Sequence, residues 1–182
     1  MTAASSQRRR AGIALGIAAM AIIVSASNFL VQFPINDWLT WGALTYPVAF
    51  LVTDLTNRSL GAAAARRVIY VGFACAVALS IGLATPRIAL ASGSAFLVAQ
   101  LLDVFVFNRL RGQVWWMAPL VSSGLGSAVD TALFFSLAFA FTPVPWQTLA
   151  MGDFGLKLVL ASVMLLPFRL MMSVLRPQPQ ST

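Results

Sequence analysis

Apolar runs separated by short polar segments constrain the fold of this 182-residue chain more than any other feature. A helix rises 1.5 Å per residue, so about 20 apolar residues cross the ~30 Å hydrocarbon core of a bilayer. Backbone polar groups must be paired in lipid, and a helix pairs them within one segment. We therefore expect an all-α membrane protein with a single six-transmembrane-helix bundle. The expected spans cover residues 11–33, 39–56, 68–85, 88–107, 115–141 and 153–175. Between them we expect short turns at 34–37 and 86–87, a small-residue linker that ends at Arg66-Arg67, and an outer loop at 142–152.

The composition excludes a water-soluble fold. Hydrophobic residues make up 59% of the chain and charged residues only 9%, so polar residues could not cover a soluble surface. The net charge of +7 comes from arginines that lie between the apolar runs, without the basic stripe and interleaved aromatics of a nucleic-acid site. With both termini cytoplasmic, every basic residue except Arg87 and Lys157 falls on the cytoplasmic side, as the positive-inside rule requires. We expect no direct nucleic-acid partner.

The same reasoning divides the chain into three parts. Residues 1–10 form a basic cytoplasmic tail that we expect to be mobile, residues 11–175 the transmembrane domain, and residues 176–182 a cytoplasmic C-terminal tail. A secretory signal peptide is the alternative for the first run, because Ser25-Ala26-Ser27 loosely resembles a cleavage site. The apolar run continues past that site, which favours a membrane span.

Small residues in the first run predict a close helix contact. Gly12 and Gly16 form a GxxxG pattern, and Ala14 with Ala18 forms a second small pair. Such a face lets two helix backbones approach closely. The contact could lie within the bundle or with a partner subunit, and packing within the bundle is the favoured reading.

The residue types exclude most catalytic chemistry. The chain contains no histidine, one cysteine and five acidic residues, all of them aspartate. The usual zinc, haem and iron–sulfur ligand sets are therefore missing, as is a Cys–His nucleophile pair. No glycine-rich phosphate loop is present. We expect no enzymatic activity, no cofactor and no metal site.

Polar residues inside the apolar runs are the candidates for a binding site. Translocon scales give a cost of roughly 2.5–3.5 kcal/mol for a charged residue at the centre of a membrane helix, so such residues need a functional or structural reason. The candidate substrate-binding residues are Asp130, Asp103, Gln100, Asn28, Asp54 and Lys157.

Each acidic candidate also has a structural alternative. Asp54 lies four residues before Arg58 on one helix face, so it could form an ion pair with Arg58, or with Arg66-Arg67 across the loop. Asp103 could bond to Arg109 or Arg111 near the cytoplasmic edge. Asp130 has no basic residue within two turns of its own helix, which makes it the strongest functional candidate.

Lys157 has two candidate partners, Asp153 at i, i−4 and Asp130 on the preceding helix. Carboxylates and amides inside apolar and aromatic walls suit a small planar molecule that offers N–H donors. We hypothesise that Asp130, together with Gln100 or Asp103, binds the ring N–H groups of such a molecule.

Several segments resemble a known family. The segments SNFLVQFP (27–34), TWGALTYPVAFLVTDLTNRSLGAAAARR (40–67), QLLDVFVFNRLR (100–111), WWMAPLVSSGLGSAVDT (115–131) and DFGLKLVLASVMLLP (153–167) closely resemble the bacterial queuosine precursor transporter family. The resemblance implies a multi-pass importer of the bacterial inner membrane. Its substrate would be a planar deazapurine, 7-cyano-7-deazaguanine and/or 7-aminomethyl-7-deazaguanine, used for queuosine in tRNA. All six candidate residues stand at motif positions of that family.

The partners implied are the lipid bilayer and the small planar substrate. A homo-oligomer and energising subunits both remain open. In the alternative reading, the chain is the substrate-binding subunit of an energy-coupling-factor transporter for a vitamin or nucleobase, with the small-residue face of its first helix docking on the partner.

Overall fold

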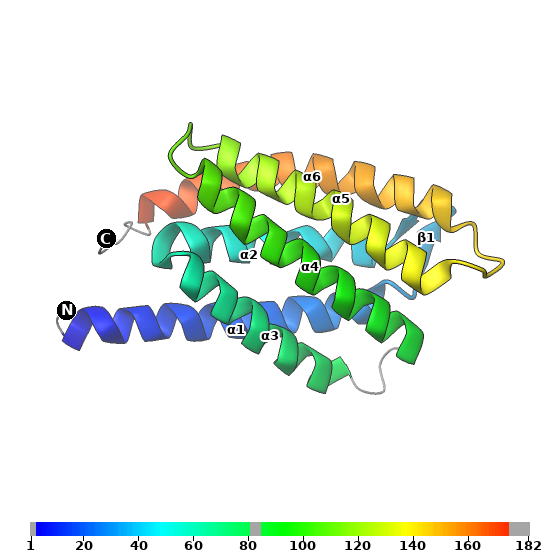
Figure 1. The fold of residues 1–182 in the computed structure, drawn as a ribbon, viewed down its shortest axis with the longest axis horizontal. Helices are drawn as coiled ribbons and strands as arrows, with labels where there is room; N and C mark the ends of the chain where they lie inside the picture. The colour runs from blue at the N-terminus through cyan, green and yellow to red at the C-terminus, as the bar shows by residue number, and fades with distance from the viewer. Residues whose placement is uncertain (1–2, 81–84, 175–182) are drawn as a thin grey trace.

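The computed structural model describes residues 3–80 and 85–174 of the chain. Within these residues the fold is all-α, as predicted, with one short β-hairpin (Figure 1). The C-terminal tail predicted at 176–182 lies outside the described residues. The elements are α1 (Ala3–Leu30), β1 (Pro34–Asn36), β2 (Leu39–Thr40), α2 (Gly42–Leu60), α3 (Ala62–Ser80), α4 (Pro86–Leu110), α5 (Met117–Phe139) and α6 (Trp146–Val174).

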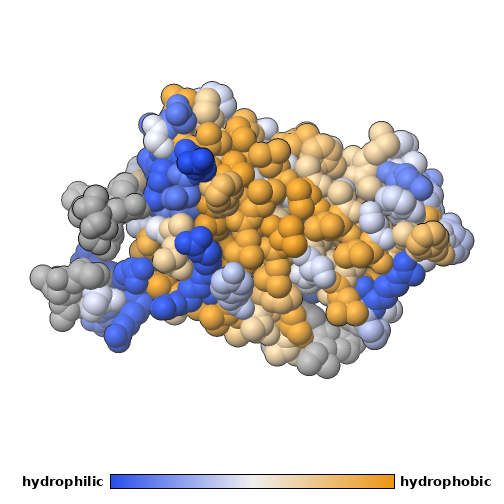
Figure 2. All heavy atoms as spheres, in the orientation of Figure 1, coloured by the Kyte–Doolittle hydropathy of each residue, from blue (hydrophilic) through white to orange (hydrophobic). Residues whose placement is uncertain are grey.

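The helices form one antiparallel bundle. At one end lie the start of α1, the α2–α3 junction, the α4–α5 connection and the end of α6; we call this the terminal end (Figure 1). The hairpin and the α5–α6 connection lie at the opposite end, the hairpin end. Figure 2 shows hydrophobic residues across the middle of one face and hydrophilic residues gathered toward its two ends, the pattern expected of a bundle that sits in a bilayer.

Four of the described helices are long and apolar enough to cross a membrane. They are Ser6–Leu30, Pro86–Leu110, Met117–Phe139 and Trp146–Ser173. The other two, α2 and α3, pack among these four, and each carries charged residues near the junction that joins them. The count of six spans and the cytoplasmic position of the termini stay predictions.

Several helices are longer than the sequence predicted, because polar residues and small residues extend them. Residues 3–10 are helical and continue into α1 without a break. The small-residue segment after α2 is not a linker: only Gly61, with φ 88°, separates α2 from α3. A positive φ is a conformation that glycine adopts without strain.

Prolines also open or continue helices where the sequence predicted turns. Pro86 and Arg87, predicted as a turn, form the first turn of α4, where the Thr85 hydroxyl accepts a hydrogen bond from the Ile88 amide at 3.4 Å. Proline suits this position because its missing N–H would be unpaired there anyway. The predicted outer loop 142–152 is shorter, since α6 begins at Trp146. Pro167 lies inside α6 and does not end it.

The hairpin lies on the start of α6. Pro34 pairs with Thr40 across the two antiparallel strands. A Cβ on Gly152 of α6 would overlap the Trp38 carbonyl oxygen, so only glycine admits the hairpin backbone here. The segment predicted as a simple turn therefore packs tightly against the bundle.

The GxxxG pattern packs within the chain. A Cβ on Gly12 would lie 3.1 Å from Leu60 of α2, and one on Gly16 would lie 3.0 Å from Val68 of α3. The prediction of a close contact inside the bundle is confirmed. Because Gly12 and Gly16 face α2 and α3, their side of α1 is not available to a partner. Ala14 lies on another side of α1 and is exposed.

Arginine side chains cap helix C-termini at both ends of the bundle. At the hairpin end Arg87 donates to carbonyls at the end of α5, including that of Ala140 at 2.6 Å. At the terminal end Arg58 donates to the Arg111 carbonyl at 2.9 Å, and Arg111 donates to the Asn57 carbonyl at 3.1 Å. These bonds supply donors to carbonyls that a helix leaves unpaired. They also explain why one arginine lies at the hairpin end.

Candidate functional site

A buried ion cluster joins α5 to α6. The Lys157 ammonium donates to Asp130 Oδ2 at 2.8 Å and to the Thr131 hydroxyl at 3.3 Å, and it lies 2.6 Å from Asp153 Oδ2. Thr131 in turn donates to Asp153 Oδ2 at 2.8 Å. Both predicted partners of Lys157 are confirmed. An ammonium has three N–H groups, so these contacts satisfy it fully.

One carboxylate oxygen of the cluster is left over. Asp130 Oδ1 is buried and has no partner at hydrogen-bond distance among the described residues, although the Tyr46 hydroxyl is close enough to interact with the carboxylate. Asp130 as a whole is 2% exposed. A buried acceptor without a donor costs about 1–3 kcal/mol, so an oxygen of this kind indicates a place where a ligand donor can bind.

Asp130 borders a pocket near the hairpin end, which we call the hairpin-side pocket. Its empty space, including the part open to the surroundings, is about 330 Å³. Tyr46 and Phe134 supply aromatic walls, and Ser92 donates to Asn28 Oδ1 at 2.6 Å. The Lys157 ammonium lies 5.0 Å from the centre of the Tyr46 ring, in cation–π range. The lining residues are Ser27, Asn28, Val31, Gly42, Ala43, Tyr46, Ser92, Asp130, Phe134, Asp153 and Lys157.

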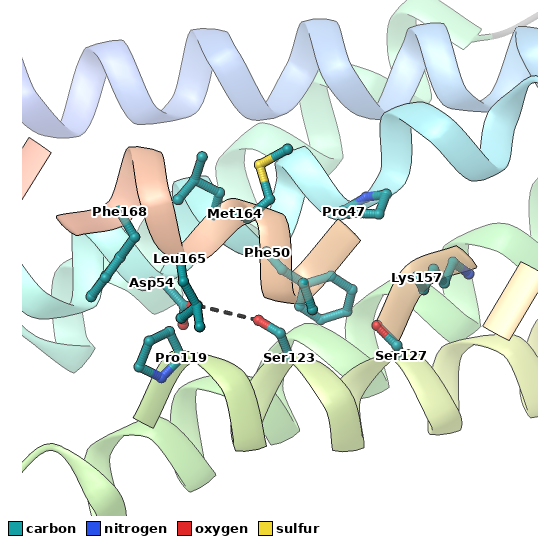
Figure 3. A pocket seen from close by; sticks show the side chains of 12 residues that line it. Pro47, Phe50, Asp54, Pro119, Ser123, Ser127, Lys157, Met164, Leu165 and Phe168 are labelled. Carbon is teal, nitrogen blue, oxygen red and sulfur yellow. Dashed lines mark hydrogen bonds between the residues drawn. The ribbon is translucent and has the colours of Figure 1, made fainter. Parts of the chain in front are cut away.

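A second pocket runs from Lys157 toward the terminal end; we call it the terminal-side pocket (Figure 3). Its empty space, including the part open to the surroundings, is about 320 Å³. Asp54 lines this pocket, and its Oδ2 accepts a hydrogen bond from Ser123 at 3.2 Å. Ser127 and the ring of Phe50 lie between Asp54 and Lys157 (Figure 3). Lys157 borders both pockets, so the ion cluster separates them.

A buried polar network lies behind Asp54, between α2 and α4. Thr53 donates to Gln100 Oε1 at 2.5 Å. The amide nitrogen of Gln100 and both carboxylate oxygens of Asp103 are buried without a hydrogen-bond partner among the described residues. Asp54 and Asp103 are close enough to interact electrostatically. Several donors and acceptors of this network therefore lack a hydrogen-bond partner.

Two predicted ion pairs are wrong. Arg58 donates to a backbone carbonyl instead of to Asp54, and the ion pairs found among residues 3–80 and 85–174 all involve Lys157. Asp103 likewise pairs with neither Arg109 nor Arg111. The reason is rotational: Asp103 lies on the face of α4 that is fully buried, while Arg109 is exposed.

The six predicted site residues fall into two groups. Asn28, Asp130 and Lys157 border the hairpin-side pocket, and Asp54 lines the terminal-side pocket. Gln100 and Asp103 line neither of these pockets and lie behind Asp54. Asp130 therefore shares its pocket with Asn28 and an aromatic ring, not with Gln100 or Asp103 as the hypothesis had grouped it.

Sequence reasoning left three contributors out of the site. Asp153 holds Lys157 from the same helix, and its i, i+4 spacing was the available signal. Tyr46 and Thr131 carry no comparable signal, because only the packing of the helices brings them to Lys157. Across the described part of the chain, no group of three or more metal-binding side chains is close enough to hold a metal ion.

A bundle of apolar helices that encloses two pockets and a buried ion cluster defines a multi-pass membrane transporter. Residues 40–85 and 79–172 match the model of the family described as "Putative vitamin uptake transporter". The chain belongs to this family, whose members are transporters and not enzymes, and it is a multi-pass protein of the bacterial inner membrane.

Curated relatives cover most of the chain. It is 37% identical to the "Queuosine precursor transporter" of Escherichia coli strain K12, over 80% of this chain and 79% of that protein. It is 38% identical to the "Probable queuosine precursor transporter" of Haemophilus influenzae, over 88% of this chain and 86% of that protein. No solved structure matches the chain.

Proposed function

We propose that this protein imports queuosine precursors, 7-cyano-7-deazaguanine, 7-aminomethyl-7-deazaguanine or both, for the modification of tRNA. The names of relatives that are 37–38% identical over most of the chain support this substrate class. The hairpin-side pocket supports it independently, because its chemistry suits a flat base.

The observation that carries the proposal is the unpaired Oδ1 of Asp130 beside two aromatic walls. The pyrimidine edge of a deazaguanine presents a ring N–H and an amino group, and a carboxylate accepts from such donors. Proteins read isolated bases in this way, by hydrogen bonds to the edge and stacking on aromatic rings. In our proposal Asp130 binds the N–H donors, Tyr46 and Phe134 contact the ring faces, and the Asn28 amide bonds a further polar edge.

The ion cluster is the barrier that the substrate must pass. Lys157 and Asp153 are both on α6, while Asp130 and Thr131 are on α5. If α5 and α6 separate, Lys157 loses Asp130 but keeps Asp153, so its charge stays balanced in lipid. Alternating access then moves the base from the hairpin-side pocket to the terminal-side pocket.

Queuosine in tRNA tests the proposal. Cells that lack both their own transporter and precursor synthesis are complemented with this chain and given a low concentration of one precursor. We expect the wild type to restore queuosine and Asp130→Asn to abolish restoration at normal membrane abundance, because an amide replaces the charged acceptor.

Asp37→Asn is the matched control, since Asp37 is exposed in the hairpin turn and lines neither pocket. It should restore queuosine as the wild type does. Full restoration by Asp130→Asn would show that the Asp130 carboxylate does not bind the base.

A further inference from the structure

Asp54 and Asp103 form a buried pair of carboxyl groups with no basic partner. They come from α2 and α4, are 2% and 0% exposed, and interact electrostatically with each other. Every ion pair among the residues that the structure describes involves Lys157, so neither carboxyl is neutralised by an ion pair. Within the part of the chain that the structure describes, neither oxygen of Asp103 has a partner at hydrogen-bond distance, although Ser122 and Ser123 are close enough to interact with the carboxyl.

Hydroxyls of α5 contact the pair, and no cation among the described residues forms an ion pair with it. From α5, Ser122 donates to Asp54 Oδ1 at 3.5 Å and Ser123 to Oδ2 at 3.2 Å. From α4, the Gln100 amide lies one turn before Asp103. From α6, Lys157 lines the same pocket, at the far end from Asp54 (Figure 3). Its ammonium is paired with Asp130 and Asp153.

The remaining charges near the pair are engaged or face away. Arg58, one turn further along α2, donates to the Arg111 carbonyl, and Arg111 donates to the Asn57 carbonyl. On α3, Arg66 and Arg67 are exposed. The charged residues of α1 lie in its first turns, well before the part of α1 that packs on the centre of the bundle.

Two adjacent carboxylates cannot both stay ionised in such surroundings. A buried charge without a partner is costly, and a second like charge adds repulsion. Carboxyl groups that share a site resolve this by holding one proton between them. The unpaired oxygens of Asp103 supply the acceptors that such a proton needs.

We propose that the Asp54–Asp103 pair binds one proton and is the coupling site of transport, an inference that rests on the proposed function. Asp54 lines the terminal-side pocket and can exchange the proton with it, while Asp103 behind it shares the proton. When the bundle has opened toward the hairpin end and α5 then separates from α6, a proton passes the ion cluster with the base and binds one carboxylate oxygen of the pair. When it opens toward the terminal end, the O–H bond breaks and the proton leaves with the base.

Purified protein in liposomes separates this inference from the proposed function. Counterflow, in which unlabelled 7-cyano-7-deazaguanine inside exchanges for labelled precursor outside, needs no ion gradient and tests transport alone. An inward proton gradient should then drive accumulation above the outside concentration, and a protonophore should abolish it. Adding precursor to lightly buffered liposomes should also make the outside medium more alkaline.

Variants locate the coupling site. Asp103→Asn should keep counterflow but lose gradient-driven accumulation, because it removes the second negative charge that favours proton binding by Asp54. Asp37→Asn should keep both. The alkalinisation by the wild type gives a readout that does not depend on how the variants fold. Counterflow without alkalinisation, accumulation driven by sodium instead, or gradient-driven accumulation by Asp103→Asn would each overturn the inference. Absent counterflow with either precursor would instead refute the proposed function.

Discussion

Replacing Lys157 with methionine should strongly destabilise the bundle. Methionine keeps much of the length of the side chain but removes the ammonium that lies 2.8 Å from Asp130 and 2.6 Å from Asp153. With all groups ionised, the cluster of two carboxylates and one ammonium goes from a net charge of −1 to −2 inside the protein. Removing one partner of a buried ion pair costs about 3–5 kcal/mol.

Thermal unfolding of purified protein in detergent measures the effect. A chain of this size loses about 2–4 °C in Tm per kcal/mol, so the methionine variant should unfold roughly 6–20 °C below the wild type. Asp153→Asn is the matched control, because it leaves a neutral pair of Lys157 and Asp130 and should cost less. Combining Lys157→Met with Asp130→Asn and Asp153→Asn should recover much of the loss, since no charge remains. A Tm for Lys157→Met equal to that of the wild type would refute the view that the cluster holds α5 to α6.

Two further substitutions test the packing that positions the site. Gly126→Ala would place a Cβ 2.6 Å from Cε1 of the buried Phe50, so we expect a loss of about 1–3 kcal/mol in the free energy of unfolding and a lower Tm. Gly155→Ala is the control, because its Cβ would have no atom within 4 Å, and it should not lower the Tm. Thr53→Val removes the donor to Gln100 Oε1 and should cost about 1–3 kcal/mol, because a buried acceptor is left without a partner. An unchanged Tm in either Gly126→Ala or Thr53→Val would show that these contacts do not hold α2 in place.

The helices could be predicted because lipid leaves an apolar run few alternatives to a helix. Their ends could not, since the polar residues that mark a membrane boundary do not stop a helix. Residues 3–10 and Trp146 extend α1 and α6 beyond the apolar runs, and Pro86 starts a helix because it occupies the first turn.

Partners on one helix could be predicted better than partners on different helices. Asp153 and Lys157 pair as their i, i+4 spacing indicates. Asp54 and Arg58 share the same spacing but do not pair, because the rotation of α2 against its neighbours turns Asp54 toward the hydroxyls of α5. That rotation depends on contacts such as Phe50 against Gly126, which no spacing along one helix reveals.

Equilibrium binding of labelled 7-cyano-7-deazaguanine to purified protein tests the central claim most directly. The claim is that the unpaired oxygen of Asp130 binds the base in the hairpin-side pocket. A hydrogen bond to a charged group contributes about 1.5–3 kcal/mol, so Asp130→Asn should bind roughly 10- to 150-fold more weakly than the saturable wild type. Equal affinity of the two proteins, at equal thermal stability, would contradict the account.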